Sequence, residues 1–147
     1  MENLANTNPT TPTKIKLDFK DSKYATGRRK TSIAKVWLKK GTGLIYVNGK
    51  KMPDYFKRPV HQLLVVRPLE ITDVLTNYDV RCSVKGGGMS GQAGAIILGI
   101  SKALILFEEN LKKVLKKDKL TTRDSRVVER KKYGHRKARR SFQFSKR

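Results

Sequence analysis

The chain has 147 residues, with 34 Lys or Arg against 12 Asp or Glu, so its formal net charge is +22. A folded monomer with this much like charge repels itself, and a polyanion such as nucleic acid relieves that repulsion. One cysteine, Cys82, and two histidines exclude a disulfide framework and Cys/His zinc sites. No apolar run reaches the roughly 18 residues that span a bilayer. We therefore expect no metal and no cofactor. An anionic membrane surface is the other partner that this charge would suit, but the basic tail lacks an amphipathic apolar stripe, so we expect no membrane partner.

The positive charge is concentrated near the C-terminus. Residues 1–23 carry a net charge of +1, residues 24–111 carry +8, and residues 112–147 carry +13. This asymmetry predicts a mildly basic body with a nucleic-acid-binding arm. Residues 1–23 are rich in Asn, Thr and Pro, which is typical of disorder. We therefore expect an N-terminal extension over 1–23, a globular domain over 24–120, and an extended basic tail over 121–147.

The first half of the expected domain has the patterns of short strands. Ala34, Val36 and Leu38 alternate with Ile33, Lys35, Trp37 and Lys39, which is the strand period. After a glycine turn at 41–43, a second short strand is expected over 44–47. Asn48-Gly49 is a strong hairpin signal, because both residues tolerate positive φ, and a third strand over 50–52 would pair back.

Helical patterns dominate the rest of the domain. Residues 54–67 are expected to be partly helical, with Pro59 in the first turn and Pro68 ending the helix. Further elements are expected over 70–75 (helical), 80–85 (strand), 91–107 (helix, with apolar residues at the helical period) and 108–119 (helix). This order predicts an α+β domain with one small sheet backed by helices.

Beyond Leu120 apolar residues are too sparse to offset the entropy of ordering the chain. We expect this tail to have no fixed fold without a partner. Its cations stand in clusters that Tyr133, His135, Phe142 and Phe144 separate. Cations neutralise phosphates and aromatic rings stack on unpaired bases, so the pattern favours RNA binding.

Two further features of the body suggest phosphate contacts. Arg28-Arg29-Lys30 is a basic cluster that we place at the start of a strand, and guanidinium groups suit phosphate oxygens. Gly86-x-Gly88-x-x-Gly91 has the spacing of a dinucleotide-binding loop, but no second mononucleotide-binding half fits after it. Two interpretations of Gly86, Gly87 and Gly88 remain: a tight turn, or backbone N–H groups that bind nucleic-acid phosphate.

Catalysis has little support in the sequence. His61 and His135 are isolated, no nucleophile is spaced into an evident triad, and the acidic residues form no paired motif. We expect that the chain is not an enzyme and has no catalytic residues.

Several motifs together resemble the small-subunit ribosomal protein nine family. They lie at Tyr24–Lys30, Gly86–Ala95, Gly99–Leu104, Thr122–Arg126, Val128–Gly134, Arg136–Arg140 and Gln143–Arg147. The resemblance implies the fold of the second domain of ribosomal protein five, which has a left-handed crossover. It also implies a structural role in the head of the small subunit, next to other ribosomal proteins.

The resemblance also implies which residues contact RNA. Lys146 and Arg147 would reach the anticodon stem-loop of the peptidyl-site tRNA. The implied contacts with small-subunit ribosomal RNA are Arg28, Arg29, Lys30, Arg123, Arg126, Arg130, Lys131, Lys132, Arg136, Lys137, Arg139 and Arg140.

The pattern is most similar to alphaproteobacterial and mitochondrial members of the family. The N-terminus lacks arginine and an apolar signal core, which suits a protein encoded in an organelle. We expect the mitochondrial matrix rather than the bacterial cytoplasm. Two rival functions remain open. One is a generic nucleic-acid-packaging protein, and the other is a kinase-like enzyme that shares this fold and binds a nucleotide on its glycine loop.

Overall fold

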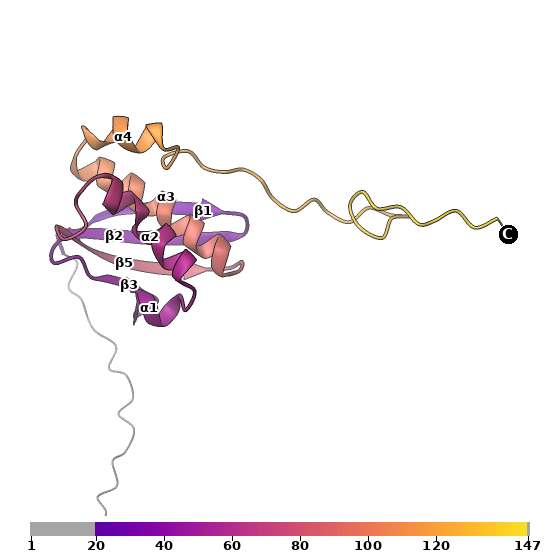
Figure 1. The fold of residues 1–147 in the computed structure, drawn as a ribbon, viewed down its shortest axis with the longest axis horizontal. Coiled ribbons are helices and arrows are strands. Elements are labelled where there is room, and N and C mark those ends of the chain that lie inside the picture. The colour runs from indigo at the N-terminus through magenta and orange to yellow at the C-terminus, as the bar shows by residue number, and fades with distance from the viewer. Residues whose placement is uncertain (1–19, 147) are drawn as a thin grey trace, which may run out of the picture.

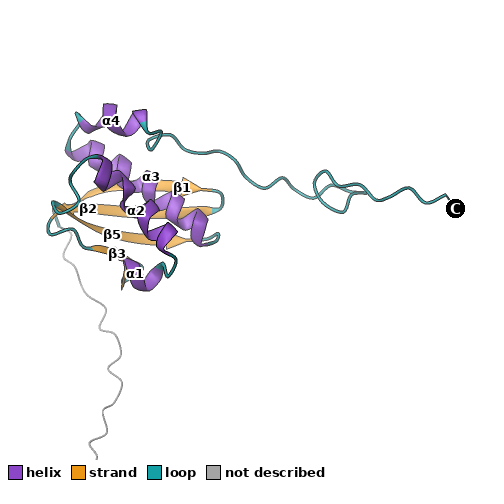
Figure 2. Cartoon of the chain, viewed as in Figure 1, coloured by secondary structure: helices purple, strands orange, loops and turns teal. Residues whose placement is uncertain are grey.

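A computed structural model describes residues 20–146 of the chain, so most of the expected N-terminal extension and Arg147 lie outside the described residues. The described part forms one five-stranded sheet in the order β1-β2-β5-β3-β4, with helices on one face (Figure 1). The α+β class with a small sheet backed by helices is confirmed. The residues after α4 run away from this body as extended chain (Figure 2).

The sheet begins with a hairpin whose first strand was missed. β1 (Lys23–Arg29) pairs antiparallel with β2 (Ser32–Lys40) along its whole length. Because β1 ends at Arg29 and Lys30 turns the chain at φ +50°, the basic cluster Arg28-Arg29-Lys30 closes a strand. Our placement of this cluster at a strand start was wrong. The strand expected around Ala34, Val36 and Leu38 is confirmed as β2.

The second hairpin follows its sequence signal. β3 (Ile45–Val47) pairs with β4 (Lys50–Lys51), and the turn residues Asn48 and Gly49 have φ of +51° and +80°. Met52 leaves the strand and starts α1 (Met52–Tyr55). β5 (Tyr78–Lys85) lies between β2 and β3, antiparallel to the first and parallel to the second. The expected strand over 80–85 is therefore confirmed, with two more residues at its start.

The connection from β3 to β5 is a left-handed crossover. Figure 1 shows β3 and β5 both running from left to right, with β5 above β3 and the helices in front of the sheet. The chain between them passes through α1 and α2 on that front side. The hand is opposite to the general preference for parallel connections, as the resemblance implied.

Pro68 does not end the helix that contains it, so this expectation was wrong. α2 runs over Pro59–Ile71 with Pro59 at its start, and it takes in part of the segment expected to be a separate helical piece. Its buried residues His61, Val65, Pro68 and Leu69 form one helical stripe that packs against the core. Burial of this stripe offsets the roughly 3 kcal/mol that an interior proline costs a helix.

The core helix is α3 (Met89–Phe107), followed by the shorter α4 (Leu111–Lys117). By length and composition α3 could cross a membrane. In the fold, however, its small and apolar residues pack against β1, β2 and α2. The contact with β1 is close, since a Cβ on Gly27 would lie 1.9 Å from the Ala95 carbonyl oxygen. The core thus lies between one face of the sheet and the helices, with α3 closest to β1 and β2.

Candidate nucleic-acid interface

The glycine loop at Gly86–Gly88 joins β5 to α3, beside the turn of the β1–β2 hairpin. Gly86 and Gly87 have φ of +76° and +63°, a backbone conformation that other residues rarely adopt. A Cβ on Gly87 would lie 2.2 Å from Ser32 Oγ. The Ser32 hydroxyl also donates a hydrogen bond of 3.0 Å to the Gly86 carbonyl. These contacts support the tight-turn interpretation of the loop.

The same loop leaves the start of α3 approachable. Gly88 is the N-cap residue, no side chain caps the helix, and a Cβ on Gly88 would meet no atom within 4 Å. The first N–H groups of a helix have no acceptor within it and carry the positive end of the helix dipole. This geometry suits a phosphate oxygen. The structure therefore fits both interpretations of the loop at once.

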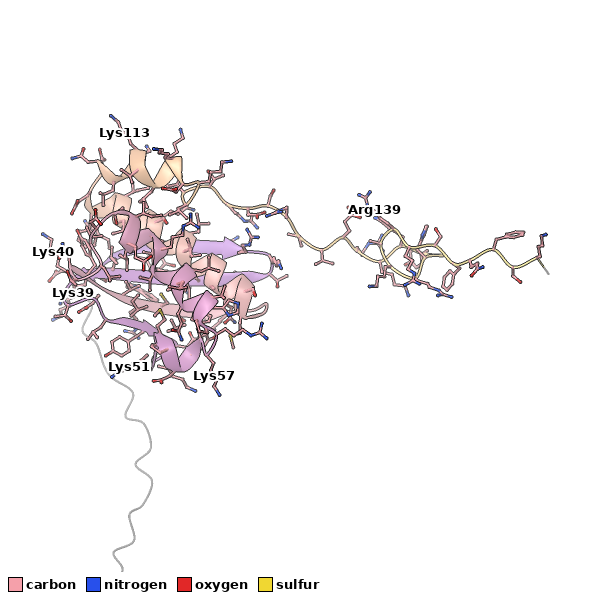
Figure 3. All side chains as sticks on the ribbon, viewed as in Figure 1. Lys39, Lys40, Lys51, Lys57, Lys113 and Arg139 are labelled. Atoms are coloured by element: carbon pink, nitrogen blue, oxygen red, sulfur yellow. The ribbon has the colours of Figure 1, made fainter. Side chains whose placement is uncertain are left out.

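An open cavity of about 630 Å³ lies over this helix start. We call it the glycine-loop cavity, and the described residues that line it include no carboxylate. Its cations come from two places in the chain: Lys30 from the first hairpin, and Lys57 and Arg58 from the segment between α1 and α2 (Figure 3 labels Lys57). Lys57 and Arg58 could not be predicted as part of this site, because no sequence motif marks them and only the crossover brings them to Gly88.

Side-chain hydrogen bonds hold the walls of this cavity together. Tyr55 Oη donates to Gln92 Oε1 at 2.7 Å, and Gln92 Nε2 donates to the Gly86 carbonyl at 3.2 Å. Asn48 exchanges two hydrogen bonds with the backbone of Val84, at 2.8 and 3.1 Å. The turn after β3, the short helix α1 and the glycine loop are thus linked, which positions the cations around the helix start.

His61 is not isolated, contrary to our expectation. Its Nε2 lies 3.0 Å from Ser90 Oγ in the first turn of α3, and its ring stacks edge-on against Phe56. A serine and a histidine in contact also occur in hydrolytic triads, where a carboxylate accepts a hydrogen bond from the other ring nitrogen of the histidine. No described carboxylate has this position next to His61. The pair therefore pins α2 to the start of α3.

The dinucleotide interpretation of the loop conflicts with the fold. After α3 the described chain has a short helix and extended residues, and no further parallel strand that would carry a ribose-binding acid. Glu108 lies about 20 residues after the loop, where a ribose-binding acid would stand in such a fingerprint, but it accepts a hydrogen bond of 2.8 Å from the Tyr78 hydroxyl. Its role is to hold the end of α3 on β5.

An ion pair ties the base of the tail to the body. The Arg29 guanidinium, at the end of β1, contacts the carboxylate of Asp124. Arg126 donates to the same carboxylate at 2.7 Å. Hydrogen bonds from Arg126, together with the contact with Arg29, hold the pKa of Asp124 well below its usual range. Arg29, an expected RNA contact, therefore has a partner within the protein and fixes where the tail leaves the body.

The outer tail forms a small loop whose cations are exposed. His135 and Ser141 form an isolated antiparallel β-bridge, and the backbone N–H of Arg136 donates to the Arg140 carbonyl at 2.7 Å. Arg139 binds both oxygens of Glu129, at 2.7 and 2.9 Å, which lowers the pKa of Glu129. Figure 3 shows Arg139 on this loop, far from the body. The following tail cations form no ion pair with a residue that the structure describes: Arg123, Arg130, Lys131, Lys132, Arg136, Lys137, Arg140 and Lys146.

The expected RNA contacts therefore fall into two groups. Arg28, Lys30 and the glycine loop lie together at one end of the sheet. The tail cations lie along an extended segment that points away from the body, with Lys146 exposed near its end (Figure 2). Arg147 lies outside the described residues.

The comparison with protein families agrees with this arrangement. The family described as Ribosomal protein S9/S16 matches residues 27–147, from the end of β1 through the glycine loop to the end of the tail. A match of this extent covers the body and the tail together. The chain therefore belongs to the ribosomal protein S9/S16 family, a structural, non-enzymatic family of the small ribosomal subunit.

Proposed function

We propose that this structural protein of the small ribosomal subunit binds small-subunit ribosomal RNA in the subunit head through two surfaces. One is the glycine-loop cavity with its neighbours Arg28 and Lys30. The other is the basic tail from Arg123 onward. The observation that carries the proposal is the extended tail, whose cations largely lack acidic partners among the described residues.

The glycine-loop cavity has the chemistry of a backbone-phosphate site. An uncapped helix start faces a space lined by three cations and by no described carboxylate. A phosphate there would accept hydrogen bonds from backbone N–H groups and neutralise Lys30, Lys57 and Arg58. Because the contacts involve no base edge, this surface would position the RNA without reading its sequence.

The tail suits RNA that surrounds it on several sides. Its rings Tyr133 and Phe144 are 95% and 86% exposed, so both are accessible to a partner. Such rings stack on unpaired bases while the neighbouring cations contact phosphates. The tail therefore gains its order from the RNA that it threads.

The proposal extends to tRNA and to the compartment. Lys146 lies near the end of the described tail, and the resemblance implies that Lys146 and Arg147 reach the peptidyl-site tRNA and so support translation. As part of the same proposal, the protein belongs to the mitochondrial ribosome rather than to a bacterial one. Fractionation of the cell that makes this protein, followed by detection of the chain in small subunits of either compartment, tests the latter point.

The test of the tail surface compares two variants that remove equal charge. In one, Arg130, Lys131 and Lys132 become Gln. In the control, Lys112, Lys113 and Lys116 on α4 become Gln. We expect the tail variant to bind small-subunit ribosomal RNA more weakly and to lose about 0.7–0.9 from the slope of log K against log salt for each phosphate contact removed. Equal losses in both variants would contradict a specific tail surface.

The tRNA contact has a separate test. Deletion of Lys146 and Arg147 is expected to leave subunit assembly intact and to weaken retention of tRNA in the peptidyl site. Small subunits that carry the truncated chain would be compared with subunits that carry the full chain by tRNA filter binding. Unchanged tRNA affinity would contradict the contact.

Ultraviolet crosslinking in native lysate separates the rival functions. The proposal expects crosslinks from the tail to small-subunit ribosomal RNA, with a few to tRNA anticodon stems. Crosslinks spread over many RNAs would favour a generic packaging protein. ATP binding by the full chain would favour the kinase-like alternative.

A further inference from the structure

β1 is an end strand of the described sheet. It stands first in the strand order β1-β2-β5-β3-β4 and pairs with β2 alone among the described strands (Figure 2). The backbone N–H and C=O groups of a strand point to its two sides at alternate residues. Alternate residues of β1 therefore direct these groups away from the sheet, where a further strand would pair with them.

An apolar groove of about 400 Å³ lies beside this edge. We call it the β1 groove, and its lining comes from β1 and from the C-terminal half of α3: Tyr24, Ala25, Thr26, Lys102, Ile105 and Leu106. Leu106 is 56% exposed, and Ile105 is partly exposed. Ala25 is the inward residue of β1 at this point, and its single methyl group is too small to cover the two side chains of α3.

One occupant can use the edge and the groove together. A strand added to β1 would place its side chains beside those of β1 on the same face of the sheet, with about 4.5–5.5 Å between opposite Cβ atoms. The residue opposite Ala25 would then lie on the helix side, over Ile105 and Leu106. Its neighbours two positions away follow the same face, so the groove selects apolar residues at every second position of the added strand.

The charge of the groove is positive. Lys102 is exposed and forms no ion pair with a residue that the structure describes. The groove lining includes no carboxylate, so a carboxylate on the occupant would complement Lys102. RNA is a poor match, because one cation among apolar side chains neutralises few phosphates and a nucleic acid has no peptide groups to pair with β1. These observations favour a polypeptide.

We propose that the β1 groove binds an extended segment of a neighbouring protein of the small subunit, which joins the sheet as a strand next to β1. The segment has apolar residues at every second position and a carboxylate that faces Lys102. In this mode of recognition, main-chain hydrogen bonds supply affinity and pockets for alternate side chains supply specificity. The chain belongs to a family of ribosomal proteins, so it functions beside other proteins in one particle. The inference uses none of the residues assigned to the glycine-loop cavity or the tail.

A photocrosslink identifies the segment. The full chain with Leu106→p-benzoylphenylalanine would be assembled into small subunits and irradiated, and the crosslinked product would be identified by mass spectrometry. Leu63→p-benzoylphenylalanine is the control, since Leu63 is 63% exposed on α2. We expect position 106, and not position 63, to crosslink one segment of another small-subunit protein, with alternate apolar residues and an acidic residue. Crosslinks from position 106 to RNA, to residues 1–19 of this chain or to nothing would overturn the inference.

Backbone methylation then tests the added strand. Synthetic copies of the crosslinked segment, each N-methylated at one residue, would be titrated against the full chain. A strand faces its partner with every second N–H group. We therefore expect methylation at alternate residues to abolish binding and methylation at the residues between them to have little effect. Equal effects at all positions would overturn the inference, because the segment would then bind without joining the sheet.

Side-chain variants locate the groove and separate this inference from the proposed function. Leu106→Ala is expected to weaken binding of the unmethylated segment about fivefold or more, whereas Leu63→Ala retains it. Both variants are expected to bind small-subunit ribosomal RNA as the native chain does. Unchanged affinity of Leu106→Ala for the segment would overturn the inference and leave the proposed function intact. Loss of ribosomal RNA binding by Leu106→Ala alone would also overturn it, because the groove would then be part of the RNA surface.

Discussion

At Gly27 the backbone of β1 approaches the backbone of α3 directly. A Cβ at this position would lie 1.9 Å from the Ala95 carbonyl oxygen and 2.6 Å from the Gly99 nitrogen. Neither atom belongs to a flexible side chain, so the strand and the helix would have to separate. The residue is therefore required for the packing of the first hairpin on the core helix.

The variant Gly27→Ala tests this contact. We expect it to lower the free energy of unfolding by about 3 kcal/mol or more, the upper end of typical overpacking costs. Urea unfolding followed by circular dichroism would measure the change. Gly88→Ala is the control, because its backbone φ of −107° is ordinary and the space around it is open. Its cost should stay below about 1 kcal/mol, and equal losses in the two variants would refute the argument.

Tyr78 gives the fold an alkaline limit. Burial of the ring and the hydrogen bond to Glu108 raise the pKa of Tyr78 to about 12, from an ordinary value of 10.0. A raised pKa means that the unfolded chain loses this proton first. The contribution of Tyr78 to the free energy of unfolding is thus fully present below pH 10 and is lost as the pH rises from 10 to 12.

We therefore expect the free energy of unfolding of the native chain to decrease between pH 10 and pH 12. Tyr78→Phe should weaken this dependence, although the variant loses one hydrogen bond and is less stable at pH 8. Urea unfolding at several alkaline pH values would measure both curves. Parallel curves for the two proteins would assign the alkaline loss to other groups.

At the scale of elements, Asp79 organises the connection between β2 and β3. Its carboxylate accepts the N–H groups of Thr42 and Leu44 across this turn. Burial alone would raise the pKa of Asp79, but the backbone hydrogen bonds outweigh it and lower the pKa. A lowered pKa means that this stabilisation is present above the ordinary carboxyl range and is lost as the pH falls through the folded-state pKa.

Asp79→Asn is expected to destabilise the fold at neutral pH by about 1.5–3 kcal/mol, the range for hydrogen bonds to a charged group. The stability of this variant should also fall less in acid than the stability of the native chain does. Thermal unfolding at pH 7 and near pH 3 would show both effects. Asp54→Asn, in the exposed helix α1, is the control and should change little at either pH.

At the scale of the whole molecule, body and tail behave as two parts joined at Asp124. The Arg29–Asp124 contact is the ion pair between them among the described residues, while Glu129 and Arg139 pair within the tail. This contact is weak in free energy, as partly exposed pairs are. Its effect is on direction, because it determines where the tail leaves the domain.

We expect Asp124→Asn to leave the melting temperature nearly unchanged and to speed tryptic cleavage after Arg123 and Arg126 several-fold. Limited proteolysis with mass spectrometry would measure the rates at these sites. Glu129→Gln removes the same charge from the same tail, but its partner Arg139 is also in the tail. Equal cleavage of the two variants would show that the body does not hold the tail base.

Local patterns were sufficient for several elements. Alternation in β2, the Asn48-Gly49 turn and the helical period of α3 each predicted the element that forms. β1 was missed because its inward residues, Ala25 and Gly27, are too small to produce an apolar signal. Their size makes sense only against the backbone of α3, which is distant in sequence. The fate of Pro68 likewise depended on burial that no local pattern reports.

The amino-acid sequence by itself determined the family, the α+β class and the loop at Gly86–Gly88, and it predicts a division into body and basic tail. Charge, periodicity and motif order are properties of the chain that need no contacts. Only the tertiary structure decided that Lys57 and Arg58 meet the helix start, that Arg29 is held by Asp124, and that Tyr24, Trp37 and Arg81 share a row. These groupings depend on crossover and strand register, which arise from the burial of the whole core and place residues far apart in sequence side by side.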